Sequence, residues 1–391
     1  TTGSVTIPMM KKTGYPGEFA GAVEAAASTG GQIMPPIMGA AAFIMAEMTD
    51  FEYSEIIVRA ILPAFLYFLG IFLGVHFKAK KLGLKGLPRE ELPKWGKLLP
   101  KIYLLVPLVL LVYMIIAGET MAKSAIYATI AAIAVSLINK DDRMTPSKFV
   151  NGLENGGKNC LSIGIACGIA GIISVCITMT GLGGKLITYV VSLSNGHLII
   201  ALFLTMICCI VLGMGVPTTA NYIIMASTCA PILINGMGMH VLAANMFVFY
   251  FGIVADITPP VALAAYAGSA IAKAPPMKTA WNATRLAIAA FIIPYIFAFN
   301  NEMIFVGDDV TVWSVASITI SATLGMLSIA SGLMGYLIHD LKWISRIALI
   351  AGGLLMIIPG TASDLAGFAV LAAIFVLQTI ENKKEKKAAS V

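Results

Sequence analysis

Length, composition and charge restrict the chain to one broad class of protein. Its 391 residues are 58% hydrophobic and only 12% charged, with a mean hydropathy of +0.89. Soluble globular domains carry about 25% charged residues, so the composition excludes that class and predicts a polytopic membrane protein embedded in the lipid bilayer. The net charge of +6 does not indicate nucleic-acid binding, because the basic residues gather at the ends of apolar stretches without interleaved aromatic residues.

Apolar stretches near the length of a membrane span recur along the chain. A helix needs about 20 residues to cross the hydrocarbon core, and these lengths fit helices rather than barrel strands, so the sequence predicts an all-α fold. The uninterrupted stretches are 56–77, 102–117, 123–138, 159–180, 241–257, 284–299, 313–338, 343–358 and 365–380. The chain begins with TTGSVTIP, without an initiator Met or a signal peptide, and we expect it to be the C-terminal part of a longer protein.

Charged loops predict which side of the membrane each segment faces. The loop at 78–101 carries eight basic residues against two acidic ones, which predicts a cytoplasmic location. The alternation of spans then places the acidic segments 50–55 and 302–309 outside and the C-terminal tail ENKKEKK inside. The polar stretch 145–158 is expected to lie on the cytoplasmic surface, with a short linker as the alternative.

Two pairs of segments repeat in the same order. A Thr pair occurs in TTGSVTIPMM at 1–10 and again in PTTANYIIMA at 217–226. The first of these segments is followed by a Pro pair in GGQIMPPIMGAAAF at 30–43, and the second by a Pro pair in VADITPPVALAAYA at 254–267. In this alignment Gln32 corresponds to Asp256. A chance match is the alternative, but the shared order and similar spacing favour a repeat. The first Thr-Thr segment leads to Lys11 and Lys12, which lie on the basic, cytoplasmic side of the membrane. The second Thr-Thr segment leads to NGMGMH on the opposite side of the membrane, so the repeats are predicted to be inverted.

The repeats predict helices that are interrupted at membrane depth. We expect broken helices at 18–48 and 241–272, and a re-entrant hairpin at 197–234 whose arms, 197–213 and 218–234, flank the tip sequence GMGVPTT. Non-helical backbone at this depth is tolerated where it is buried in protein or lines a wet cavity, although a simple kink is the alternative. Inverted repeats with broken helices are typical of secondary transporters that bind substrate near the midplane.

These elements predict four regions. The regions are a first-repeat hairpin arm and broken helix at 1–48, scaffold helices and cytoplasmic loops at 49–158, the second repeat at 159–300 and additional transmembrane helices at 301–391.

Candidate ion-binding residues gather at the predicted hairpin tip and the second break. Asp256 stands in an apolar run, where an ionised carboxylate is costly unless it is paired or faces a cavity; a structural hydrogen bond to exposed backbone is the alternative. Oxygen donors suit sodium. The predicted sodium ligands are Asp256, the carbonyl groups of Gly213 and Gly215, and the hydroxyl groups of Thr218, Thr219 and Thr258.

Further polar residues are candidates for binding the ion or the substrate. Small polar residues in membrane helices equally serve helix packing, which remains the alternative for this set. The candidates are Thr1, Thr2, Gly3, Ser28, Thr29, Gln32 and Asn221, together with Glu24. No arginine is assigned to a substrate carboxylate, because Arg59 and Arg285 are expected near the membrane interfaces.

Two stretches of the chain resemble the hairpin and broken-helix signatures of the TRAP transporter permease, part of the tripartite ATP-independent periplasmic carboxylate importers. They are TTGSVTIPMMKKTGYPGEFAGAVEAAASTGGQIMPP and GMGVPTTANYIIMASTCAPIL. The resemblance is to the fused permeases served by TAXI-type binding proteins. It covers about 1–300, and 311–391 is similar to the extra C-terminal helices of some fused members.

This resemblance implies partners, a location and a mechanism. It implies a sodium-driven elevator transporter in the bacterial inner membrane that imports a carboxylate and needs no cofactor other than the coupling ion. The implied partners are a TAXI-type periplasmic solute-binding protein and a small permease subunit or fused N-terminal helices, which would precede Thr1. The chain is therefore not expected to transport alone.

Two other classes of membrane protein remain as alternatives. An intramembrane enzyme is weakly supported, because the sequence contains neither G-x-S-x-G nor H-E-x-x-H and its four His residues lie far apart near predicted helix ends. A channel is disfavoured, because no repeated filter sequence or ring of charges accompanies the re-entrant segments. We therefore expect a transporter without enzymatic activity.

Overall fold

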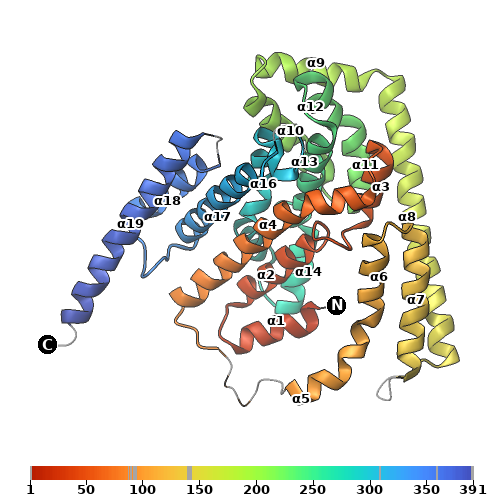
Figure 1. Cartoon of the computed structure of the whole chain (residues 1–391), viewed down its shortest axis with the longest axis horizontal. Helices are drawn as coiled ribbons and strands as arrows, with labels where there is room; N and C mark the ends of the chain where they lie inside the picture. Colours follow the sequence, from red (N-terminus) through yellow and green to blue (C-terminus); the bar gives the residue numbers. More distant parts are fainter. Residues whose placement is uncertain are drawn as a thin grey trace.

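The structure, a computed structural model, describes residues 2–86, 88, 90, 95–138, 143–307, 310–357 and 360–388 (Figure 1). These residues form helices and connecting turns, and the one β-bridge recorded among them joins Tyr336 and Asp340. Seven described segments are long and apolar enough to cross a membrane: Tyr53–Lys81, Leu99–Ile116, Met121–Ile138, Thr218–Met237, Pro276–Phe299, Val312–Met334 and Thr361–Glu381. The predicted all-α polytopic fold is confirmed.

The first broken helix consists of α2 (Gly17–Gly30) and α3 (Ala40–Thr49), preceded by α1 (Gly3–Lys12). The last residue of α2 has to be glycine, because the ring of Tyr67 occupies the space of a side chain there; a Cβ atom at Gly30 would lie 2.2 Å from Tyr67 Cε1. The Tyr67 hydroxyl donates a hydrogen bond of 2.7 Å to the Ala26 carbonyl. The predicted break in 18–48 is confirmed, and α4 (Tyr53–Lys81), which carries Tyr67, holds the broken end in place.

The second broken helix has a similar construction. It consists of α13 (Val241–Val254), the 3-10 turn η3 (Ala255–Ile257) and α14 (Leu263–Ala272). Every residue that follows Val241 in α13 is buried, so this half-helix forms the centre of the core. The Pro35-Pro36 and Pro259-Pro260 peptide bonds are both cis. The predicted break in 241–272 is confirmed.

The predicted hairpin is formed by helices on either side of a short tip. The arms are α10 (Leu198–Gly213) and the consecutive helices α11 (Thr218–Thr228) and α12 (Ala230–Met237). Their bounds agree with the predicted arms 197–213 and 218–234, and residues 214–217 form the turn between them.

The broken helices pack against each other at the centre of the molecule (Figure 1). Helix α2 packs along α14, and the two backbones meet at glycines: a Cβ atom at Gly268 would lie 2.6 Å from the Gly21 carbonyl oxygen. Helix α3 packs on α13 in a corresponding way. Lys11 donates a 2.8 Å hydrogen bond to the Ala272 carbonyl, so the C-terminal ends of α1 and α14 lie together, as the charge-based topology requires.

The helices between α4 and the hairpin run around one side of this centre (Figure 1). They are α5 (Trp95–Leu98), the 3-10 helix η2 (Leu99–Leu105), α6 (Val106–Ile116), α7 (Met121–Ile138), α8 (Pro146–Met179) and α9 (Leu182–Ser194).

Helix α8 corrects the expectation for the stretch 145–158. This stretch is neither a separate surface segment nor a linker, because 146–158 forms the first part of one continuous helix of 34 residues. At 1.5 Å per residue, α8 is about 51 Å long and exceeds the roughly 30 Å hydrocarbon core. An ion pair of 2.6 Å between Lys158 and Glu154, one helical turn apart, supports the helical conformation of the polar part. The region boundary expected at 158 therefore falls inside a helix.

The C-terminal helices attach to the core through α4 and α15. After α15 (Pro276–Leu286), α16 (Ile288–Phe299) and the 3-10 turn η4 (Asn301–Ile304), the chain forms α17 (Val312–Met334), α18 (Trp343–Leu355) and α19 (Thr361–Ala388). Helix α17 packs along α4, while α18 and α19 extend to the outside of the molecule (Figure 1). Arg285 donates a 2.9 Å hydrogen bond to the Leu333 carbonyl, and Lys81 forms a 3.4 Å ion pair with Asp340.

Candidate functional site

The hairpin tip lies directly on the second helix break. Helix α10 ends at Gly213, and a Cβ atom there would lie 2.7 Å from Asn221 Nδ2 and 2.8 Å from the Cβ atom of Ala255. Only glycine therefore allows the end of α10 to approach both α11 and η3 this closely. Gly215 follows with a φ of +76°, a conformation that glycine adopts at no steric cost, and turns the chain into α11.

Polar side chains join the hairpin to the broken helix. The Thr218 hydroxyl donates to Asp256 Oδ2 at 3.3 Å, and Asn221 Nδ2 donates to the Gly252 carbonyl at 3.0 Å. Thr258, on the same turn as Asp256, donates to the Val254 carbonyl at 2.8 Å. The structure thus brings together four predicted residues, Gly213, Thr218, Asn221 and Asp256, from segments about 40 residues apart in sequence.

Two oxygen atoms of this cluster retain unused capacity for a ligand. Asn221 is completely buried, yet its Oδ1 atom accepts no hydrogen bond from any described residue. Buried polar atoms in proteins nearly always have a partner, so an unpaired oxygen acceptor indicates a place for a bound donor or cation. Asp256 is half-buried, and Thr218 supplies its one recorded side-chain hydrogen bond among the described residues.

Half-helix ends add fixed partial charges to the cluster. Helix α11 begins at Thr218, and the positive end of its dipole favours an anion. The C-terminal end of α13, with η3, points carbonyl groups toward the break and favours a cation. The half-helix ends therefore favour a cation at the break and an anion at the start of α11.

The first repeat contains a second polar cluster, centred on Glu24 of α2. Three hydroxyl groups donate to this carboxylate: Thr2 forms a very short contact, Thr6 lies at 2.5 Å and Ser28 at 3.4 Å. Gly3 packs against the Glu24 side chain, with 3.1 Å between its ideal Cβ position and Glu24 Cγ. Thr2, Gly3 and Ser28 were predicted from the sequence, whereas Thr6 was not, although its spacing of four residues from Thr2 is a detectable signal for one helix face.

The two clusters lie on elements that pack together, because α2, which carries Glu24, packs against η3, the turn that carries Asp256. Other predicted residues lie around them without a hydrogen bond that joins them to either cluster. Thr29 is buried at the end of α2, Gln32 packs beside Gly39, Thr219 is half-buried on α11, and Gly215 is exposed with Val261 as its neighbour. Thr1 lies outside the described residues.

The fold and this site define a class of protein: a polytopic membrane protein with two interrupted helices and a hairpin whose polar tip meets the core, which is the architecture of a membrane transporter. Residues 1–308 match the family described as the tripartite ATP-independent periplasmic transporter, DctM component. The chain therefore belongs to this family, the large permease component of TRAP transporters, as its sequence signatures predicted. No curated protein matches the chain.

Proposed function

We propose that this permease imports an organic acid in symport with sodium, and that the acid is delivered by a periplasmic binding protein of the TAXI type. The observation that carries the proposal is the contact between the Thr218 hydroxyl and Asp256 Oδ2, which links the hairpin tip to the broken helix. A cation bound there would be shared by two elements that can separate only when it leaves.

The chemistry of the cluster supports sodium as the coupling ion. Sodium is a hard cation and takes oxygen ligands, and the cluster offers the Asp256 carboxylate, the Thr218 hydroxyl and the unpaired Asn221 Oδ1. The adjacent N-terminal end of α11 favours an anion, which is consistent with a carboxylate substrate.

The inverted arrangement supports an elevator mechanism. The hairpin and the broken helices would form the moving transport domain, and α4 with the C-terminal helices would belong to the scaffold. The small permease subunit, or fused N-terminal helices that take its place, would complete the scaffold in the bacterial inner membrane. This assignment needs no enzymatic step.

Uptake by the full-length permease tests the proposal. The permease, reconstituted in proteoliposomes with its binding protein, would be assayed with a panel of radiolabelled carboxylates, with and without an inward sodium gradient. We expect uptake that requires sodium, and we expect Thr218→Val and Asp256→Asn to raise the sodium concentration for half-maximal uptake.

Thr188→Val is the matched control, because this exposed threonine on α9 donates only to the carbonyl of its own helix. Uptake that follows a proton gradient alone, or wild-type sodium dependence in both site variants, would contradict the proposed coupling.

A further inference from the structure

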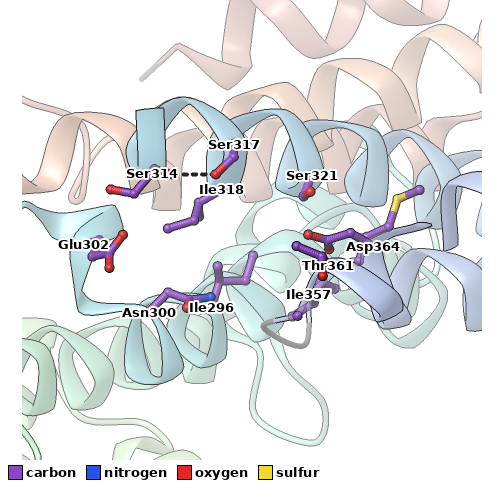
Figure 2. A pocket seen from close by; sticks show the side chains of 12 residues that line it. Ile296, Asn300, Glu302, Ser314, Ser317, Ile318, Ser321, Ile357, Thr361 and Asp364 are labelled. Atoms are coloured by element: carbon purple, nitrogen blue, oxygen red, sulfur yellow. Dashed lines mark hydrogen bonds between the residues drawn. The ribbon is translucent and has the colours of Figure 1, made fainter. Parts of the chain in front are cut away.

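The two ends of α17 lie in surroundings of opposite charge. Near its start, a polar cavity of about 250 Å³ contains Glu302 and Asp364 and has no Lys, Arg or His among the residues that line it (Figure 2). Near its other end, three basic side chains from three different helices come together. They are Lys81 of α4, Arg285 of α15 and Arg346 of α18, named here the basic cluster.

The basic cluster surrounds the last carbonyl groups of α17. Arg285 and Arg346 each donate a hydrogen bond to the Leu333 carbonyl, at 2.9 and 3.0 Å, so their guanidinium groups lie next to each other on one oxygen atom. Lys81 Nζ and Arg346 Nε each lie 3.1 Å from the position that a Cβ atom at Gly335 would occupy. The three cations therefore converge on one helix end.

The negative charge around the basic cluster is smaller than its positive charge. The end of a helix is equivalent to about half a negative charge, and Asp340 adds one full charge through its 3.4 Å ion pair with the lysine. Lys78 and Glu18, which interact with each other close by, offset each other. Arg285 and Arg346 form no ion pair with any described residue. Capping of α17 therefore leaves a surplus of positive charge, which favours a bound anion.

The two guanidinium groups have donors left for that anion. Each guanidinium carries five N–H donors, and the hydrogen bonds recorded with described residues use one donor of Arg285 and two of Arg346. Arg285 is exposed and Arg346 is half-buried, so a ligand can reach both from outside the protein. Planar forks of this kind match the oxygen atoms of a phosphate group.

Apolar side chains beside the basic cluster indicate a lipid rather than a soluble anion. The Arg346 guanidinium lies 4.6 Å from the ring centre of Trp343, whose side chain is exposed at the start of α18. Ile344 and Ile347 on the same turn are also exposed. Trp is enriched where a membrane meets water, and the charged loops predict that the end of α4, with Lys81, faces the cytoplasm. The basic cluster then lies at the level of the headgroups of the cytoplasmic leaflet.

We propose that the basic cluster binds the phosphate group of one anionic phospholipid, of the phosphatidylglycerol type, from the cytoplasmic leaflet. The phosphate bridges Arg285 and Arg346, while the acyl chains cover Trp343, Ile344 and Ile347. Basic pockets between membrane helices on the cytoplasmic side suit such headgroups, and the positive charge of a choline or ethanolamine headgroup would be repelled by the cluster. The bound lipid joins α15 to α18 and so holds the C-terminal helices on the core.

Lipid retention tests this assignment. The purified full-length permease would be delipidated and titrated with phosphatidylglycerol, phosphatidylethanolamine and phosphatidylcholine of identical acyl chains, with bound lipid measured by native mass spectrometry. We expect a preference for phosphatidylglycerol, reduced roughly tenfold by Arg285→Gln or Arg346→Gln, because each variant loses a charge-assisted hydrogen bond. Arg59→Gln removes the same charge at a site paired with Glu55 and should have no effect.

A charge-conserving variant separates lipid binding from a purely structural role of the arginines. Arg285→Lys keeps the positive charge and should retain most of the preference for phosphatidylglycerol. Equal retention of the three lipids, or an unchanged preference in both glutamine variants, would overturn the proposal. Equal losses in Arg285→Lys and Arg285→Gln would overturn it as well, because the charge would then contribute nothing.

Two further measurements distinguish a phospholipid from a soluble phosphate. Ile344→Ser combined with Ile347→Ser should weaken retention of phosphatidylglycerol, and inorganic phosphate or glycerophosphoglycerol without acyl chains should compete poorly. Strong competition by these soluble phosphates together with wild-type retention in the double variant would refute the assignment to a lipid.

Discussion

Gly213→Ala is the sharpest test of the contact between the hairpin tip and the broken helix. The added Cβ atom would lie 2.7 Å from Asn221 Nδ2, 2.8 Å from the Cβ atom of Ala255 and 3.0 Å from Met225 Cε. Met225 can move, but Asn221 is held by its hydrogen bond to Gly252, and the Ala255 Cβ atom is fixed to the backbone of η3. The end of α10 must therefore move away from the break, and Thr218 is expected to move away from Asp256.

The size of the effect follows from the overpacking. An extra methyl group in a tightly packed interior costs about 1–3 kcal/mol. A hairpin whose tip has moved away from the second helix break lacks this contact and does not carry the cost. The substitution therefore shifts the equilibrium from the closed hairpin toward this open hairpin. A shift of about 1–3 kcal/mol corresponds to a change in ligand affinity of roughly 5- to 150-fold. We expect the half-saturating sodium concentration for uptake to rise within this range.

The assay is sodium-dependent uptake by the full-length permease in proteoliposomes, with thermal unfolding of the purified variant as a check on folding. Gly252→Ala should give a smaller rise, because its Cβ atom would lie 3.2 Å from Met225 Sδ and 3.4 Å from Asn221 Nδ2. Gly184→Ala on α9 is the control, because its Cβ atom would have no neighbouring atom within 4 Å. A folded Gly213→Ala protein with wild-type sodium dependence would refute the reasoning.

Three further predictions concern other parts of the chain. Glu24→Gln should weaken the contact between α1 and α2 by about 0.6–1.7 kcal/mol, which are the average and the maximum for one hydrogen bond between membrane helices, and lower the melting temperature of the purified permease; an unchanged melting temperature would contradict this. Single cysteines at Lys11 and Asn235 in a Cys-free background should react with an impermeant reagent from opposite sides of the membrane, and labelling from one side would disprove the inverted repeat. Truncation before Thr311 should leave measurable coupled uptake, since the C-terminal helices pack mainly on α4; complete loss in a correctly inserted protein would contradict this.

The interruptions of the helices could be predicted because their signals are local. Gly and Pro limit helices within a few residues, so the break after Gly30 and the ends of the hairpin arms at Gly213 and Thr218 follow from the sequence alone. The residues that approach each break could not be predicted in the same way. Tyr67, which occupies the space beside Gly30, comes from a helix 37 residues later, and its direction depends on how the helices pack.

Polar residues were harder to assign than helix ends. Asp256 could be selected because a carboxylate in an apolar run is unusual, and the structure places it against Thr218. Arg285 was expected only near an interface, whereas its guanidinium group binds the Leu333 carbonyl and joins the core to the C-terminal helices. That contact links residues 48 positions apart, and no pattern in the sequence indicates the pairing.

The two repeats share a broken helix but place their carboxylates differently, which bears on where a cation can bind. Glu24 lies on α2 before the break and already accepts hydrogen bonds from three hydroxyl groups, so its oxygen atoms are largely occupied. Asp256 lies on the break itself and accepts one longer bond of 3.3 Å from Thr218, three residues before Asn221, whose Oδ1 atom is unpaired among the described residues. A cation gains more from the second carboxylate, because fewer existing hydrogen bonds must be given up there. The site at Asp256 should therefore control the sodium dependence of uptake, while Glu24 stabilises the packing of α1 against α2.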